Sequence, residues 1–140
     1  MGLEGREPRV GAAHLVTVTL ARAWDPAEAA DAAGRIEFAI ALDPHGHPDL
    51  QAWLDDPAPW PARRLRPGKP EEDGDVAHDE EGWQLRFFAG AGADHDVPVH
   101  RICHIDGGLR PGEVLTLRAP DGEEAAWRVV DVRAARRSAE

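Results

Sequence analysis

RIEFAIALD, residues 35–43, alternates large apolar side chains with smaller or polar ones along its whole length. One side of this alternation holds Ile36, Phe38, Ile40 and Leu42, and the other holds Glu37, Ala39 and Ala41. Successive side chains of a β-strand point to opposite faces, so a period of two predicts a strand with one face in a core. We therefore expect a sheet to be the framework of the fold.

The neighbouring segments predict further strands. HLVTVTLARAW at 14–24 repeats the alternation and is rich in β-branched residues, and WQLRFFA at 83–89 also alternates. Two more runs, EVLTLRA and AAWRVVDV, are joined by PDGEE, whose proline, aspartate and glycine favour a turn. Residues 113–132 therefore predict a β-hairpin.

Helix signals follow the first strand. DPAEAADAAGR offers Asp25 as N-cap, a proline at the first helical position, Glu28 three residues after the cap and Gly34 as a stop. This pattern predicts a short helix lying on the surface of the sheet, because its alanines bury little area. One or two further helical turns are expected from Asp49.

The segment 56–82 has no apolar periodicity. It begins with several prolines and ends in a strongly acidic run. Low hydrophobicity and like charges predict a long loop here, with disorder over residues 68–81. Trp60, which stands between prolines, is expected to pin the earlier half of the loop to the core.

Six strand candidates, with residues 97–105 among them, and one clear helix predict an α+β, β-rich fold class. We expect a single domain over residues 13–133, with a mostly antiparallel six-stranded sheet curled into a small barrel or roll and one short helix after the first strand. A β-sandwich is the alternative. Residues 1–12 and 134–140 are expected to be flexible termini.

The segment VPVHRICHID, residues 97–106, holds the only cysteine of the chain and two histidines, and His95 stands just upstream. In a helix, His100, Cys103 and His104 would be neighbours at i, i+3 and i+4. That spacing suits three ligands of a divalent transition metal such as zinc. The helical geometry would therefore make the segment a metal site.

In a strand, His100 and His104 would lie about 13 Å apart at about 3.3 Å per residue, so they could not share an ion. The density of β-branched residues and the strand signals on either side favour the strand. We then expect Cys103 to face the core with Val99 and Ile105, and the two histidines to face outward. A cysteine placed there is a small core residue and not a nucleophile, so no catalytic residue and no cofactor is predicted.

The charge of the chain argues against two classes of partner. Sixteen lysines and arginines stand against 26 acidic residues, which gives a formal net charge of −10. A field of that sign repels phosphate backbones and anionic lipid headgroups. We therefore expect neither nucleic acid nor a membrane surface as a partner.

Cysteine usage and the N-terminal residues bear on localisation. A single cysteine cannot form an internal disulfide, and no apolar run follows a basic start, so we expect a cytoplasmic protein. The longest apolar run is only a strand in length, which predicts no membrane span. The excess of arginine over the single lysine is typical of a GC-rich bacterial genome.

Three functional hypotheses follow. The first is a non-enzymatic binding or assembly module that acts through its sheet surface, and through the long loop, on an unknown protein partner. The second is a metal-binding protein or metal-dependent enzyme that uses His95, His100, Cys103 and His104. The third is a carrier of a small apolar ligand inside the barrel, in a cavity lined by Phe38, Phe87 and Trp127.

Overall fold

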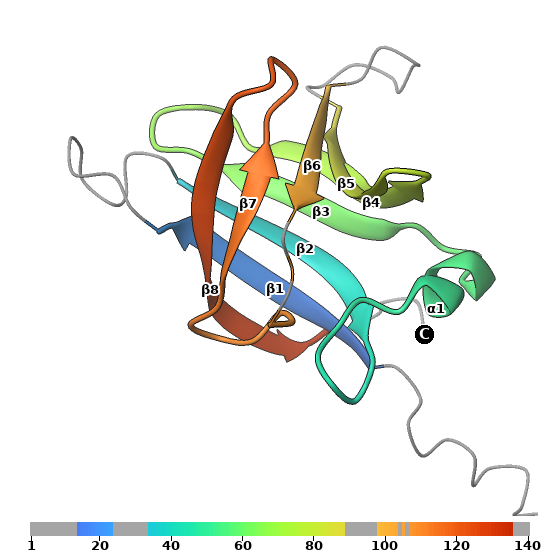
Figure 1. The fold of residues 1–140 in the computed structure, drawn as a ribbon. Helices are drawn as coiled ribbons and strands as arrows, with labels where there is room; N and C mark the ends of the chain where they lie inside the picture. The colour runs from blue at the N-terminus through green and yellow to red at the C-terminus, as the bar shows by residue number, and fades with distance from the viewer. Residues whose placement is uncertain (1–13, 24–33, 89–97, 104, 106, 136–140) are drawn as a thin grey trace, which may run out of the picture.

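The computed structural model describes residues 14–23, 34–88, 98–103, 105 and 107–135 (Figure 1). The described part contains eight strands and one helix. These are β1 (His14–Arg22), β2 (Arg35–Leu42), α1 (Leu50–Asp55), β3 (Trp60–Leu65), β4 (Glu72–Asp79), β5 (Gly82–Phe87), β6 (Val99–Cys103), β7 (Val114–Arg118) and β8 (Glu124–Ala134).

The strands form a closed antiparallel barrel. Each strand pairs with its neighbours in the sequence, and β8 pairs back with β1. The β1–β8 register shifts between Thr19 and Leu20, where a β-bulge increases the local twist of the sheet. The expected antiparallel sheet curled into a barrel is confirmed, and the alternative of a β-sandwich is wrong.

The expectation of six strands is also wrong, because β3 and β4 lie within residues 56–82, where a long loop is predicted. β4 occupies most of the segment 68–81 for which disorder is predicted. Glu72 and Asp75 of β4 lie beside arginines of the two strands that are paired with it. Asp75, for example, accepts two hydrogen bonds of 2.7 Å from the Arg86 guanidinium of β5. Like charges that would repel one another in a loop are therefore neutralised across the sheet.

Pro61 is compatible with strand structure because of its place in β3. The β2–β3 pairing runs from Arg35 opposite Leu65 to Phe38 opposite Ala62. Pro61 stands one residue beyond that last pair, so its missing N–H removes no bond from the β2–β3 ladder. A proline at such a position does not exclude a strand.

The helix predicted after the first strand falls on residues 24–33, which lie outside the described residues. The helical turns expected from Asp49 are present as α1, and the Asp49 carboxylate caps them by accepting a 3.0 Å hydrogen bond from the Ala52 N–H. The described structure is therefore mostly β rather than α+β. It contains no helix with the length and apolarity that a membrane span requires.

The termini for which flexibility is predicted, 1–12 and 134–140, lie outside the described residues apart from Ala134 and Ala135. Ala134 is the last residue of β8, and the Ala135 N–H donates a 3.1 Å hydrogen bond to the Leu15 carbonyl oxygen. The barrel therefore extends slightly beyond the predicted domain boundary at residue 133.

One end of the barrel is closed by aromatic packing beside α1. Trp60 is 1% exposed, stacks on Trp83 with ring centroids 6.0 Å apart and donates a 2.8 Å hydrogen bond from Nε1 to Asp56. The prediction that Trp60 anchors its segment in the core is confirmed. Trp53 of α1 packs edge-on against Trp83 and donates from Nε1 to the Val76 carbonyl oxygen. These rings fill the lumen at this end.

A loop contact completes the closure of this end. Leu109 is almost fully buried, and its N–H donates a 2.8 Å hydrogen bond to the Gly46 carbonyl oxygen. Gly108 lies in the left-handed region with φ of 85°, and a Cβ on it would come within 3.0 Å of that same oxygen. Glycine is required here for both backbone conformation and space.

Hydrogen exchange tests the place of β4 in the barrel. We expect amide protons within Glu72–Asp79 to exchange slowly, at rates comparable to those of β1 and β2, because β4 is paired on both sides. Amide exchange followed by NMR measures this directly. Rapid exchange throughout β4, with β1 and β2 protected, would show that the acidic segment is not part of the barrel.

Candidate functional site

The orientation of β6 determines which of its side chains enter the barrel. Residues 97–105 are predicted as a strand, and β6 at Val99–Cys103 confirms this. Within β6 the predicted faces are reversed, however, whereas Ile105, beyond the end of the strand, packs against the core as expected. Ile102 is buried at 6% exposure, and His100 lies on the same side, facing the lumen. Cys103 therefore lies on the outer face and is half-buried, so its assignment to the core is wrong.

The structure does not bring the predicted metal ligands together. His95 and His104 lie outside the described residues. His100 and Cys103 are described and project from opposite faces of β6, so the two cannot share one ion. Within the described ranges, no group of three or more His, Cys, Asp or Glu side chains is placed to hold a metal.

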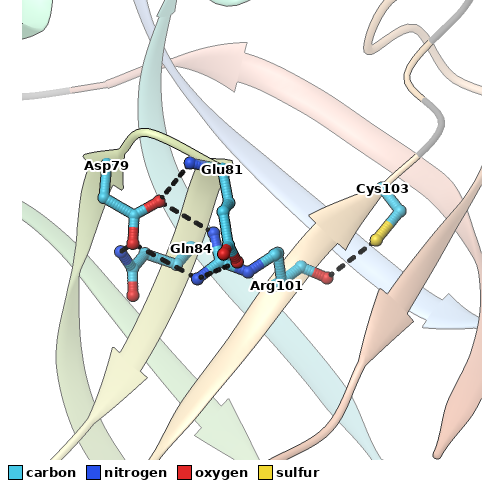
Figure 2. A network of polar contacts seen from close by, with 5 residues as sticks. All are labelled: Asp79, Glu81, Gln84, Arg101 and Cys103. Atoms are coloured by element: carbon cyan, nitrogen blue, oxygen red, sulfur yellow. Dashed lines mark hydrogen bonds and ion pairs between the residues drawn. The ribbon is translucent and has the colours of Figure 1, made fainter. Parts of the chain in front are cut away.

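The outer face beside Cys103 carries a polar network centred on Asp79 (Figure 2). The Asp79 carboxylate accepts hydrogen bonds from the Arg101 guanidinium at 3.0 and 3.3 Å, from the Gln84 amide at 3.0 Å and from the Glu81 N–H at 2.8 Å. Cys103 lies further along β6, where its Sγ is 3.8 Å from the Arg101 carbonyl oxygen. The network fastens the β4–β5 turn to β6, which is a structural role.

A cavity of about 260 Å³ occupies the lumen at one end of the barrel. The β7–β8 hairpin lies at this end, and Figure 1 shows the hairpin at the end opposite α1. Its inward-facing walls are formed by Arg22 of β1, Arg64 of β3, His100 of β6, Leu117 of β7, and Ala125 and Trp127 of β8. These strands are not all neighbours, so the cavity crosses the interior of the barrel. We call it the mouth cavity.

Three charged side chains form a group beside the mouth cavity. Glu72 of β4 lies between two arginines, 4.0 Å from the Arg64 guanidinium and 3.5 Å from that of Arg66. The Nε of Arg64 and the Oε1 of Glu72 are buried and have no hydrogen-bond partner among the described residues. Burial, and then the nearby charge of Arg66, lower the pKa of Arg64. The three side chains are half-buried, and the group carries one excess positive charge.

His100 lines the same cavity as Arg64 and lies close enough to this group to feel its charges. Its ring packs edge-on against Phe87 with centroids 5.5 Å apart, and its Nδ1 is buried without a hydrogen-bond partner in the described part of the chain. Burial lowers the pKa of His100, and the positive charge of Arg64 lowers it further. The neutral imidazole is therefore favoured, and it can donate one hydrogen bond and accept another.

The opposite wall of the mouth cavity is largely apolar. The Arg22 guanidinium lies over the Trp127 ring, 5.7 Å from its centroid, and Leu117 and Ala125 extend this wall. Trp127 is the only one of the three residues predicted for an apolar ligand cavity that lines the mouth. Phe38 and Phe87 are buried in the core at 1% and 3% exposure.

The charged lining was not identified from the sequence, although a signal for it exists. Arg22 continues the inward phase of Val18 and Leu20, and Arg64 continues that of Trp60 and Ala62. When a strand ends in a charged residue whose side chain points to the same face as the preceding core residues, the lumen at that end of the strand is expected to be polar. The alternation in HLVTVTLAR could have identified Arg22, whereas Arg64 depended on recognising β3.

Comparisons with protein-family models, with curated proteins and with solved structures found no match to this chain.

A pair of substitutions tests the orientation of β6. We expect Ile102→Ala to lower the free energy of unfolding by about 2–5 kcal/mol, because it removes a buried side chain. Cys103→Ser on the outer face should cost less than about 1 kcal/mol. Urea unfolding of both variants measures the difference. A larger loss for Cys103→Ser than for Ile102→Ala would restore the original assignment of the faces.

The outer network predicts a dependence of stability on pH. The pKa of Asp79 is lowered from 3.8 to about 2, chiefly by the hydrogen bonds from Arg101 and then by that from the Glu81 N–H. Because the pKa of Asp79 is lower in the folded state, the ionised carboxylate stabilises the fold at pH values above the ordinary pKa of 3.8. This stabilisation is lost as the pH falls towards 2. The stability advantage of the wild type over Asp79→Asn should therefore shrink across this interval.

Thermal unfolding between these pH values measures the effect. Glu80→Gln, which changes an exposed acid in the same turn, is the control and should follow the wild-type pH profile. A constant difference between the wild type and Asp79→Asn across the interval would contradict the assigned role of Asp79.

Proposed function

We propose that the protein is a non-enzymatic binding protein that holds a small organic molecule in the mouth of its barrel. The observation that carries the proposal is that two residues with a buried, unpartnered polar atom line one lumen cavity. Arg64 Nε and His100 Nδ1 have no hydrogen-bond partner among the described residues. Each such atom costs about 1–3 kcal/mol unless a ligand or solvent satisfies it.

The difference between the two ends of the barrel supports this proposal. Eight strands make an interior just wide enough to be filled by side chains or to hold one small ligand. Tryptophans and Leu109 fill the end beside α1, whereas the opposite end keeps a cavity of about 260 Å³. At about 30 Å³ for each water in the liquid, that cavity matches the volume of about nine waters. A small molecule is the occupant of suitable size.

The proposal keeps the non-enzymatic hypothesis and moves the binding site from the sheet surface to the lumen. A protein partner on the sheet surface stays a prediction. Large apolar side chains exposed in the described structure are scattered between α1 and two strands, at Leu50, Leu54, Val114 and Val130. We place the protein in the bacterial cytoplasm because its single cysteine suits a reducing compartment.

Substitutions at adjacent alanines of β8 test the binding site. Ala125 lines the mouth cavity, whereas Ala126 points to the outer face. We expect Ala125→Leu to fill part of the cavity and abolish ligand binding, while Ala126→Leu leaves it unchanged. Thermal unfolding with a library of fragment-sized acids, amides and amines measures binding. A ligand present at 100 times its Kd should stabilise the wild type by about 2.7 kcal/mol.

Two results would contradict the proposal. One is that no fragment stabilises the wild type, which would mean that the cavity holds only water. The other is that fragments stabilise Ala125→Leu as strongly as the wild type, which would place their binding outside the mouth cavity.

A further inference from the structure

Charge is distributed unevenly between the interior of the mouth cavity and its rim. Arg64 lines the interior, and the group that it forms with Glu72 and Arg66 has a net charge of one positive unit. The rim, formed by the β7–β8 turn, contributes Glu123 and Glu124. Arg118 neutralises Glu124 by an ion pair of 3.1 Å. A positive interior within a chain of net charge −10 is a local departure from the rest of the molecule.

We propose that the ligand is a small organic carboxylate, bound with its carboxylate inward beside Arg64 and His100 and its apolar body against Trp127. This inference rests on the proposed function, because it names the chemical class of the molecule in the mouth cavity. It also gives a direction of binding, since the Glu123 carboxylate at the rim repels the anionic end of the ligand.

The inner side chains suit a carboxylate. A guanidinium offers N–H donors in a fixed fork that matches the two oxygens of a carboxylate, and charge-assisted bonds of this kind are about twice as strong as neutral ones. Arg64 has a buried Nε that makes no hydrogen bond in the described structure, and His100 can add a donor from its neutral ring. Glu72 compensates only one of the positive charges, so an anionic ligand completes the balance.

The apolar wall distinguishes an organic carboxylate from a free inorganic anion. Trp127 is 5% exposed and, together with Leu117 and Ala125, presents carbon surface to the cavity. A hydrated inorganic anion would gain nothing from contact with this apolar surface. The aromatic or aliphatic part of an organic carboxylate would cover the surface and remove it from water, which is favourable. The cavity therefore combines a cationic inner end with an apolar side.

Benzoate and benzamide provide a matched pair of probes, because they share size and shape and differ in charge. We expect benzoate to bind the full-length protein, and benzamide to bind about tenfold more weakly or worse, the factor expected for a lost charge-assisted bond. Protein-observed NMR titrations detect both, and the Ala125 and Trp127 amide signals report on the mouth cavity.

Adjacent arginines of β3 provide matched variants. Arg64 lines the lumen, whereas Arg63 lies on the outer face, where it pairs with Glu37 at 2.9 Å and Glu71 at 3.3 Å. Arg64→Gln should weaken benzoate binding by about tenfold or more and leave benzamide binding unchanged. Arg63→Gln should change neither. If both variants bind benzamide with the affinity of the wild type, the substitutions have left the cavity folded.

The outcomes separate the ligand class from the proposed function. Benzamide binding in the mouth cavity as tightly as benzoate would overturn the carboxylate inference and leave the binding function intact. Inorganic phosphate shifting the same signals with higher affinity than benzoate would overturn the organic part of the inference. Binding of neither organic probe, together with failure of the fragment library to stabilise the wild type, would overturn the proposed function itself.

Discussion

The pairing of β8 with β1 is the contact on which the rest of the structure depends, because it closes the sheet and leaves no free edge in the barrel. Once the sheet is closed, every second side chain of every strand must enter one shared lumen. The inward side chains must therefore fit the volume of that lumen. A shift of one residue in the register of a strand would move all of its buried side chains to the outer face. The bulge beside Thr19 and Leu20 permits this closure while the apolar residues of β8 keep facing inward.

Charged residues inside the lumen need a physical reason. Replacing a buried ion pair by apolar side chains is often neutral or stabilising, so the pairing of Glu72 with Arg64 and Arg66 is weak evidence for a role in stability. The same barrel shows that an apolar solution is available, since Trp60 and Trp83 fill the opposite end by stacking. Two ends with the same strand geometry and different contents indicate different roles. Packing explains the end beside α1, and ligand recognition is the role that we propose for the mouth.

Much of the framework could be predicted from the sequence, because apolar alternation is a direct consequence of strand geometry. It identified β1, β2, β5 and the β7–β8 hairpin, and it identified β6 as a strand. It missed β4, whose inward face contains Glu72, Gly74 and His78 and only one buried apolar residue, Val76. The stabilising partners of its outer acids, such as Arg86 for Asp75, are distant in the sequence or become neighbours only after pairing. Local composition could not reveal such compensation.

The faces of β6 were predicted wrongly for the same reason that the charged residues lining the mouth cavity were not identified from the sequence. Apolar alternation assumes a dry interior, so it placed Val99 and Cys103 inward and His100 outward. At the mouth the interior is polar, and the inward positions are His100 and Ile102 while the outer face carries Arg101 in its ion pair with Asp79. The phase of β6 becomes clear only when Ile102 is matched with Leu117 across the β6–β7 ladder, since both are buried in the closed barrel. The apolar alternation therefore predicted the wrong faces of β6 where the lumen is polar and is not filled by packed apolar side chains alone.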